Sequence, residues 1–215
     1  MEDSKTKEKV LKRVRQALMQ KTENRFPKLD FDSALYAVSD APLELQFALE
    51  LIKVNGKFIY CADETEFCSN LKLLLNSVDI GKIFCNNEAL CLHLTNMQIP
   101  HLTMKDELVN SDTTITDCEA LVARTGSVIV SSRQSSGRRA SVFPDHHIVV
   151  ARSSQVVADL KDALQLMKVR YQDQLPSMIT AITGPSRTAD IEKTLVQGAH
   201  GAKEIYVFLI DELPL

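Results

Sequence analysis

The segment MITAITGPSRTADIE, residues 178–192, decides the fold that we predict for this chain. Its apolar beginning predicts a strand over 178–182, and the Gly184-Pro185 pair predicts the tight turn that follows. The residues after the turn predict a helix over 188–197. In this order, the three elements place the positive end of a helix dipole and its free backbone N–H groups at the mouth of a sheet, which suits an anion.

Polar residues of the same segment are candidates for binding that anion. Ser186 or Thr188 is the expected N-cap of the helix, Arg187 adds a fixed positive charge, and Asp190 falls in the first helical turn. We therefore predict ligand contacts from Gly184, Ser186, Arg187 and Thr188. A well-capped helix without a ligand would explain the same residues.

Upstream of this segment, short apolar strands alternate with amphipathic helices, which predicts a mainly parallel sheet covered on both faces. The expected strands are 57–61, 82–85, 118–123, 128–131, 147–151, 178–182 and 204–210. The expected helices of this part are 42–54, 64–75, 88–94, 155–172 and 188–197.

The beginning of the chain differs from the rest. Residues 3–21 have the apolar spacing of a separate helix, and residues 24–32 are typical of a linker. We therefore expect a helical arm and linker over 1–32 and one α/β domain over 33–215. The arm is rich in Lys and Arg, so it either contacts an anionic partner or is simply solvated. It is expected to pack on the domain or on a neighbouring subunit, and a homo-oligomer is one possible outcome.

Composition excludes several classes of function. The net charge of −3 gives no global reason to expect a nucleic-acid partner. No apolar run approaches the ~20 residues that a membrane span needs, and the charged beginning does not resemble a signal peptide, so we expect a cytoplasmic protein. The sequence has neither a G-x-G-x-x-G nor a Walker-type loop, so a tightly held dinucleotide or ATP is not expected.

The cysteines and histidines show no spacing that is typical of a metal site. The five cysteines form no C-x-x-C pair, and the five histidines form no H-E-x-x-H motif. We therefore expect no metal and no cofactor in this chain, and reduced, mostly buried thiols.

Two further loops are candidates to meet the first one. The hydroxyl and N–H groups of Thr125, Gly126 and Ser127 suit a carboxylate or phosphate, although a hydrogen-bonded turn would need the same residues. In the polar loop 132–141, Arg138 or its neighbour Arg139 suits a bidentate contact with an anion, or is merely exposed.

Two residues are candidates for proton transfer. His200 stands between glycines just after the predicted helix 188–197, where it would serve as an acid or base or would cap the helix end. Asp190 is the second candidate. His146 and His147 border a strand and either one is expected near the same mouth. The prediction as a whole requires these loops to share one cavity that attracts negative charge.

The final half of the chain resembles the lactate utilization protein C family, whose module is called the LUD domain. The resemblance rests on GPSRTADIE at 184–192, on Gly198-Ala-His-Gly201, and on Ala123-Arg-Thr-Gly-Ser127, which is similar to the family segment A-D-T-G-T. It covers about residues 117–211. Arg124 stands where the family usually has an acid, so any role of that acid is in question here.

This resemblance implies a three-layer α/β/α fold with a mainly parallel sheet, similar to the sugar-phosphate isomerase and CoA-transferase superfold. It also implies a non-redox subunit of a system that oxidises L-lactate to pyruvate, with iron–sulfur clusters in partner subunits and a small anionic ligand in this chain. Whether the chain is itself an enzyme stays open. The alternatives are a stand-alone enzyme acting on sugar phosphates or CoA esters, or of the cyclo-ligase kind, and a structural assembly module.

Overall fold

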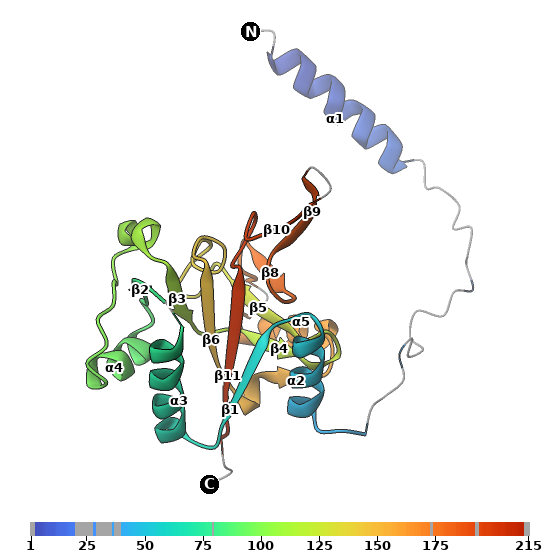
Figure 1. Cartoon of the computed structure of the whole chain (residues 1–215). Helices are drawn as coiled ribbons and strands as arrows, with labels where there is room; N and C mark the ends of the chain where they lie inside the picture. The colour runs from blue at the N-terminus through green and yellow to red at the C-terminus, as the bar shows by residue number, and fades with distance from the viewer. Residues whose placement is uncertain are drawn as a thin grey trace. The chain divides into compact units, whose positions relative to one another are not determined.

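The computed structural model describes residues 3–19, 28, 36, 40–78, 80–172, 174–191 and 194–212 (Figure 1). The chain separates into two units, which divide after Asp40. Helix α1 (Asp3–Met19) belongs to the first unit and agrees with the helix expected at 3–21. Apart from Lys28, the expected linker at 24–32 lies outside the described residues.

A five-stranded parallel sheet forms the centre of the second unit, in the order β1-β11-β6-β3-β2. Its strands are β1 (Lys57–Cys61), β2 (Ile83–Phe84), β3 (Thr113–Thr116), β6 (His146–Arg152) and β11 (Glu204–Ile210). The alternation of apolar strands and helices thus predicted four of these five strands, but it missed β3, whose sequence TTIT is not an apolar run. We call the edge where these strands begin the amino edge, and the edge where they end the carboxyl edge.

Helices cover both faces of the parallel sheet, as Figure 1 shows. On one face, α3 (Glu64–Ser77) and α4 (Glu88–Asn96) bury Phe67 and Leu94 against Ile148 and Phe208. On the other face, α2 (Leu43–Lys53) buries residues such as Leu51 against the sheet. Each apolar side chain buried in this way contributes roughly 1.5–3 kcal/mol to folding. The α/β fold with a mainly parallel sheet is therefore confirmed.

A second sheet packs beside α2 and adds a layer that the sequence pattern did not separate from the first. Its order is β7-β4-β5-β8. The strands are β4 (Ala120–Val122), β5 (Ser127–Ser131), β7 (Val156–Val157) and β8 (Ile179–Ile182). One face contacts the parallel sheet through residues such as Leu121 and Val128, and the other contacts Ala163 and Met167 of α5 (Leu160–Arg170). Helix α5 therefore forms the outer layer on this side.

The helix predicted over 188–197 is wrong, because the segment forms a β-hairpin. Strand β9 (Arg187–Ile191) pairs antiparallel with β10 (Thr194–Gln197). The backbone of Ser186 fixes the base of the hairpin: its N–H donates to the Ala202 carbonyl at 2.8 Å, and its carbonyl accepts from the Gly198 N–H at 3.1 Å. Ser186 and Thr188 therefore cap no helix, and no helix dipole points at this loop. The acidic residues that suggested a first helical turn lie among β-branched residues that favour strands.

The helix predicted over 155–172 begins later, at Leu160. Val156 and Val157 form β7 and pair with β4, and the Asp159 side chain caps the helix by accepting from the Leu160 N–H at 2.5 Å. β-branched Val156 and Val157 fit a strand, and aspartate is a preferred cap. The start of α5 is therefore set by its cap.

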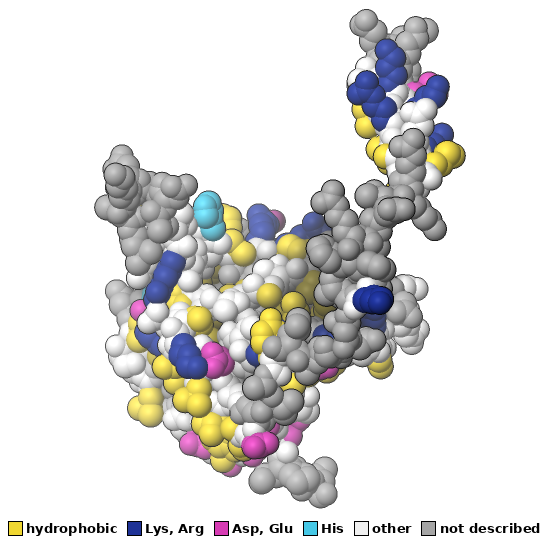
Figure 2. All heavy atoms as spheres, turned by 90° about the vertical axis from the view of Figure 1, so that its right-hand side faces the viewer, with side chains coloured by type: hydrophobic (Ala, Val, Ile, Leu, Met, Phe, Trp, Pro, Cys, Tyr) yellow, Lys and Arg dark blue, Asp and Glu magenta, His cyan; other side chains and the backbone are white. Residues whose placement is uncertain are grey.

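The outer face of α2 stays partly open. Figure 2 shows the side of the molecule that lies on the right in Figure 1, where hydrophobic side chains lie among basic ones. On α2, Leu45, Leu49 and Ile52 are each about half exposed, at 50, 51 and 56%. The helix thus buries one apolar stripe and leaves a second one accessible.

Candidate functional site

A cavity of about 300 Å³ lies at the amino edge, where the segment that opened the sequence analysis meets the parallel sheet. We call it the GPSR cavity. Its lining comes from the loop after β8, from His200 to Ala202, and from the beginnings of β6 and β11. The lining residues are Ser141, Val142, His147, Thr180 to Arg187, His200, Gly201, Ala202 and Ile205. Four predicted site residues are therefore brought together: Gly184, Ser186, Arg187 and His200.

Ser186 joins the two loops of the cavity. Its Oγ accepts a hydrogen bond from the backbone N–H of His200 at 3.2 Å, in addition to the two backbone bonds that hold the hairpin base. A Cβ added to Gly201 would lie 3.3 Å from the Ser186 Cβ, so the two loops are in close contact. The imidazole of His200 is exposed at the rim. The positions of Ser186 and His200 are thus coupled.

Gly184 and Arg187 hold this loop on the turn that follows α2. Gly184 has a φ of +80°, and a Cβ there would lie 2.5 Å from the Val54 carbonyl oxygen, so a side chain would meet backbone. The guanidinium of Arg187 donates to the side-chain oxygen of Asn55, in the amide orientation that satisfies both groups. Arg187 therefore brings a positive charge to the cavity, with Asn55 as its anchor.

His147 is the most deeply buried polar residue of the lining. It is 0% exposed, its Nε2 lies 2.8 Å from the Thr116 Oγ1, and its Nδ1 has no hydrogen-bond partner among the described residues. Burial lowers the pKa of His147 to about 4, so the ring is neutral at physiological pH. An unpaired buried nitrogen costs free energy, and a polar ligand would offset this cost.

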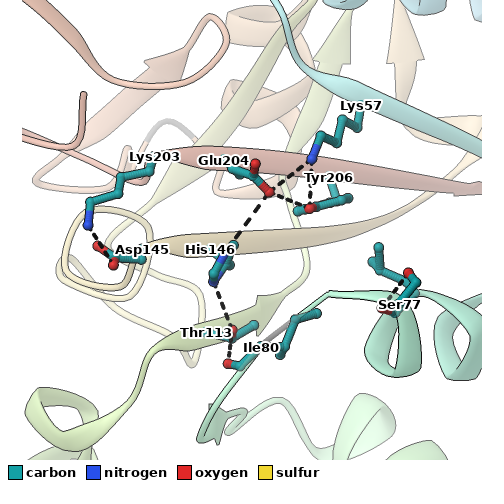
Figure 3. Close-up of polar contacts among 10 residues, drawn as sticks. Lys57, Ser77, Ile80, Thr113, Asp145, His146, Lys203, Glu204 and Tyr206 are labelled. Atoms are coloured by element: carbon teal, nitrogen blue, oxygen red, sulfur yellow. Dashed lines mark hydrogen bonds and ion pairs between the residues drawn. The ribbon is translucent and has the colours of Figure 1, made fainter. Parts of the chain in front are cut away.

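His146, the preceding residue, points to the opposite face of the sheet, because side chains alternate along a strand. Figure 3 shows it between Glu204 and Thr113 at the amino edge. Lys57 Nζ lies 2.9 Å from Glu204 Oε2 and 2.8 Å from the Tyr206 hydroxyl. The bond from Tyr206 is the main reason that the pKa of Glu204 is lowered. Only His147 of the two histidines therefore lines the GPSR cavity.

The Thr125-Gly126-Ser127 loop reaches the cavity indirectly. Ser127 Oγ lies 2.7 Å from both Thr125 Oγ1 and Thr183 Oγ1, and Thr183 belongs to the lining. Gly126 has a φ of +59°, and a Cβ there would lie 2.3 Å from the backbone nitrogen of Leu51 in α2. The hydroxyls of Thr125 and Ser127 are thus separated from the cavity by Thr183, and Gly126 allows the loop to pack closely against α2.

Three predicted site residues lie elsewhere. Arg138 lines a separate cavity of about 320 Å³ and donates to the Ser177 Oγ at 2.6 Å. Thr188 lies on β9 opposite Val196 and is not part of the lining. The backbone of Asp190 is on β9, but its side chain lies outside the described residues. The predicted single cavity thus unites the 184–187 and 200–201 segments without Arg138.

Arg124 makes a two-pronged ion pair with Asp159, the cap of α5. Its Nε and one terminal nitrogen lie 2.9 and 2.8 Å from the two carboxylate oxygens. This hydrogen bonding lowers the pKa of Asp159. Arg124 therefore connects the 125–127 loop to the beginning of α5.

All five cysteines are free, and Cys61, Cys85 and Cys118 are buried, as expected for reduced thiols. Over the described ranges, no three His, Cys, Asp or Glu side chains are grouped so that they would hold a metal ion. Within the same part of the chain, every helix is too short or too polar to span a membrane.

The chain resembles named bacterial proteins over about half of its length. It is 33% identical over 105 residues to a Lactate utilization protein C of Deinococcus radiodurans, which covers 48% of this chain and 49% of that protein. It is 35% identical over 100 residues to a Lactate utilization protein C of Bacillus subtilis, covering 45% and 42% respectively. The matches thus span about half the length of these curated relatives or less.

A solved structure and a family model extend the similarity to most of the chain. The crystal structure of a DUF162 family protein from Deinococcus radiodurans superposes with a TM-score of 0.59 at 20% identity, covering 81% of this chain and 99% of that one, which supports the fold. The LUD domain model matches residues 45–210, which include both sheets and the whole GPSR cavity. The chain therefore belongs to the LUD domain family.

Proposed function

We propose that this protein is a non-redox subunit of a lactate-utilization system and that it binds a small carboxylate, of the size of L-lactate or pyruvate, in the GPSR cavity. The observation that carries the proposal is the grouping of Ser186, Arg187, His200 and the buried, neutral His147 around one cavity. The names of the relatives supply the metabolic context.

The size and charge of the cavity favour a small anion. Its volume of about 300 Å³ is at the lower end of the range of ligand pockets, roughly 300–1,000 Å³, so a CoA ester would not fit inside it. Arg187 supplies a guanidinium that suits a carboxylate. His147 and the hydroxyls of Ser186 and Thr183 supply hydrogen-bonding groups for a hydroxyl or keto oxygen.

The electron transfer of such a system would belong to iron–sulfur partner subunits, as the family resemblance implies. This chain would hold or hand over the organic acid. If the bound acid reacts in this cavity, His200 at the rim is the side chain that we expect to exchange a proton with it.

Binding to the purified full chain tests the ligand. We expect L-lactate or pyruvate to raise the melting temperature and to give a measurable Kd by calorimetry, while a sugar phosphate and acetyl-CoA do not. Arg187→Gln should weaken binding roughly tenfold or more, because a charge-assisted hydrogen bond contributes about 1.5–3 kcal/mol. Arg138→Gln, in the separate cavity, is the matched control. Tighter binding of the sugar phosphate or acetyl-CoA would favour the stand-alone enzyme instead.

Reconstitution tests the role as a subunit. Mixed with the iron–sulfur proteins of a bacterial lactate-utilization system, the chain should restore lactate-dependent reduction of an artificial electron acceptor, and alone it should reduce none. Equal activity of the mixture with and without this chain would contradict the proposal. Restoration by Arg187→Gln at the wild-type level would instead favour a purely structural assembly module.

A further inference from the structure

A second cavity, of about 830 Å³, lies at the carboxyl edge of the parallel sheet. It receives Asn87 from the loop after β2, Asp117 from the end of β3, Arg133 and Gln134 from the loop after β5, and Arg170 and Tyr171 from the end of α5. Ligands of open α/β sheets bind outside the carboxyl ends of the strands, so the position is that of a binding site. We call it the carboxyl-edge cavity.

This cavity is distinct from the GPSR cavity. Asp117 directly follows the last residue of β3, whereas His147 and Ile205 of the GPSR cavity lie at the beginnings of β6 and β11. No residue lines both cavities. Because the strands are parallel, the two cavities occupy opposite edges of the sheet, and one small molecule cannot occupy both.

One wall of the carboxyl-edge cavity is built around a buried carboxylate. Glu119 is 1% exposed and is held by three donors: the Ser131 hydroxyl at 2.6 Å, the Tyr171 hydroxyl at 2.7 Å and an Arg170 nitrogen at 2.5 Å. A buried carboxylate is tolerated only with partners of this kind. Glu119 therefore neutralises much of the charge of Arg170 and fixes the ring of Tyr171.

Outside the Glu119 cluster, the described lining carries three charged side chains: Arg133, Asp117 and, at the exposed beginning of α4, Glu88. The guanidinium of Arg133 lies 5.8 Å from the centre of the Tyr171 ring, and among the described residues it forms no ion pair. Asp117 is half-buried and accepts from the Gln134 side chain at 2.9 Å, and burial raises its pKa. The carboxyl-edge cavity thus presents an accessible cation and a separate, partly desolvated carboxyl group on neighbouring walls.

Another part of the lining belongs to α4, where Ala89, Cys91 and Leu92 are apolar and Glu88 and Thr95 are polar. Ala89, Leu92 and Thr95 follow one another at three-residue spacing along the helix, so they share a face towards the cavity. Leu92 is 62% exposed. An apolar group of a ligand would cover this surface while its charged ends contacted the other walls.

We propose that the carboxyl-edge cavity binds a zwitterionic amino acid with a large apolar side chain: Arg133 holds the carboxylate, Asp117 holds the ammonium group, and Leu92 contacts the side chain. A simple anion satisfies only Arg133 and meets the carboxyl group of Asp117. A simple amine satisfies only Asp117 and meets the guanidinium. Only a molecule that carries both charges pairs with both walls.

Calorimetry with the full chain and L-phenylalanine, L-leucine and L-methionine tests this proposal. At least one of them should bind, and L-phenylalanine should bind roughly tenfold or more tightly than 3-phenylpropanoate or 2-phenylethylamine, which each lack one charge. The proposal would be overturned if either analogue bound as tightly as L-phenylalanine. It would also be overturned if none of the three amino acids bound at 10 mM.

Variants locate the binding. Arg133→Ala and Asp117→Asn should each weaken amino-acid binding roughly tenfold or more, with Arg133→Lys intermediate, since a lysine keeps the charge but loses the bidentate contact. Both changes lie outside the ion-paired Glu119 cluster, and unchanged far-ultraviolet circular dichroism would verify folding. Arg187→Gln in the GPSR cavity should leave amino-acid binding unaltered. If Arg133→Ala and Asp117→Asn bind as the wild type does, the site lies elsewhere and the proposal fails. Failure here would not affect lactate binding in the GPSR cavity.

Discussion

The two edges of the parallel sheet carry cavities that are built in different ways. At the amino edge, backbone segments approach one another so closely that only glycine fits, as at Gly184 against Val54 and at Gly126 against Leu51. At the carboxyl edge, charged side chains from distant parts of the chain form the walls around Glu119. One edge is shaped mainly by backbone geometry and the other by electrostatics.

This difference explains which edge the sequence reveals. Backbone geometry needs particular small residues at adjacent positions, so it leaves a contiguous motif such as GPSR. A charge cluster needs only proximity in space, so Glu119, Arg133 and Arg170 leave no motif at all. The stability of the amino edge should therefore depend on close backbone contact, and that of the carboxyl edge on charge.

The largest effect is expected at Gly126. Gly126→Val forces a branched side chain into a left-handed conformation and against the α2 backbone, whose nearest atom would lie 2.3 Å from the new Cβ. The two costs, about 1–2 kcal/mol for the conformation and about 1–3 kcal/mol for the overlap, together suggest a loss of roughly 2–5 kcal/mol. Urea denaturation measures the free energy of unfolding.

Gly137→Val is the matched control for this variant. Gly137 has a similar φ of +67°, but a Cβ there would have no atom of the described residues within 4 Å. The expected loss is therefore mainly the conformational cost, about 1–2 kcal/mol. If the two substitutions cost the same, close backbone contact is not what shapes the amino edge.

At the carboxyl edge, the loss of Arg170 should lower the free energy of unfolding most. Arg170→Met leaves Glu119 as a buried carboxylate with only hydroxyl donors, and removing one partner of such a pair costs about 3 kcal/mol. Glu119→Gln should lower the free energy of unfolding less, because Arg170 is 41% exposed and its guanidinium can be solvated. The difference between the two free energies of unfolding checks the comparison. A larger cost for Glu119→Gln would mean that packing, rather than charge, holds this wall.

The sequence predicted β1, β2, β6 and β11 of the parallel sheet because each is a short apolar run, whereas β3, with three threonines in four residues, gave no such signal. β1, at 57–61, was predicted with the bounds that the structure has. The segment 187–197 was misassigned because Asp190 and Glu192 suggested the first turn of a helix. The decisive bonds of Ser186, to Gly198 and Ala202, join residues that are 12 and 16 positions apart, which local patterns do not reveal.

The candidate site was predictable to the extent that it is contiguous. Gly184, Ser186 and Arg187 line the GPSR cavity together because they follow one another in one loop. Arg138 was grouped with them only by its charge, and its loop leads to another cavity. The role of His147 depends on which face of β6 it occupies, and the sequence alone did not show which of the two histidines faces the cavity.

The burial of His147 predicts a pH dependence of stability. With a pKa of about 4 in the folded state and about 6.5 when unfolded, the unfolded chain binds more protons between these values. Stability therefore falls as pH decreases from 6.5 to 4, by at most ~3 kcal/mol, at ~1.36 kcal/mol for each pH unit of difference. His147→Gln should remove this component from the pH profile of urea midpoints. Equally steep profiles for both proteins would contradict the burial of a neutral imidazole.

The smallest effect is expected where one helix connects the two edges. Helix α5 is capped by Asp159, which pairs with Arg124 beside the 125–127 loop, and it ends at Arg170, which pairs with Glu119. The side chains of Arg124 and Asp159 are each 35% exposed, so solvent screens this pair far more than it screens Glu119. Arg124→Ala should therefore cost only about 1 kcal/mol.

The pH dependence of this cost distinguishes the ion pair from packing. The pair lowers the pKa of Asp159, so its contribution is present above the usual aspartate value of 3.8 and is lost as pH falls through the lower folded value. Wild type and Arg124→Ala should thus differ at pH 7 and converge as the pH falls below the lowered pKa of Asp159. A difference that persists in acid would mean that Arg124 supports α5 through its aliphatic stem.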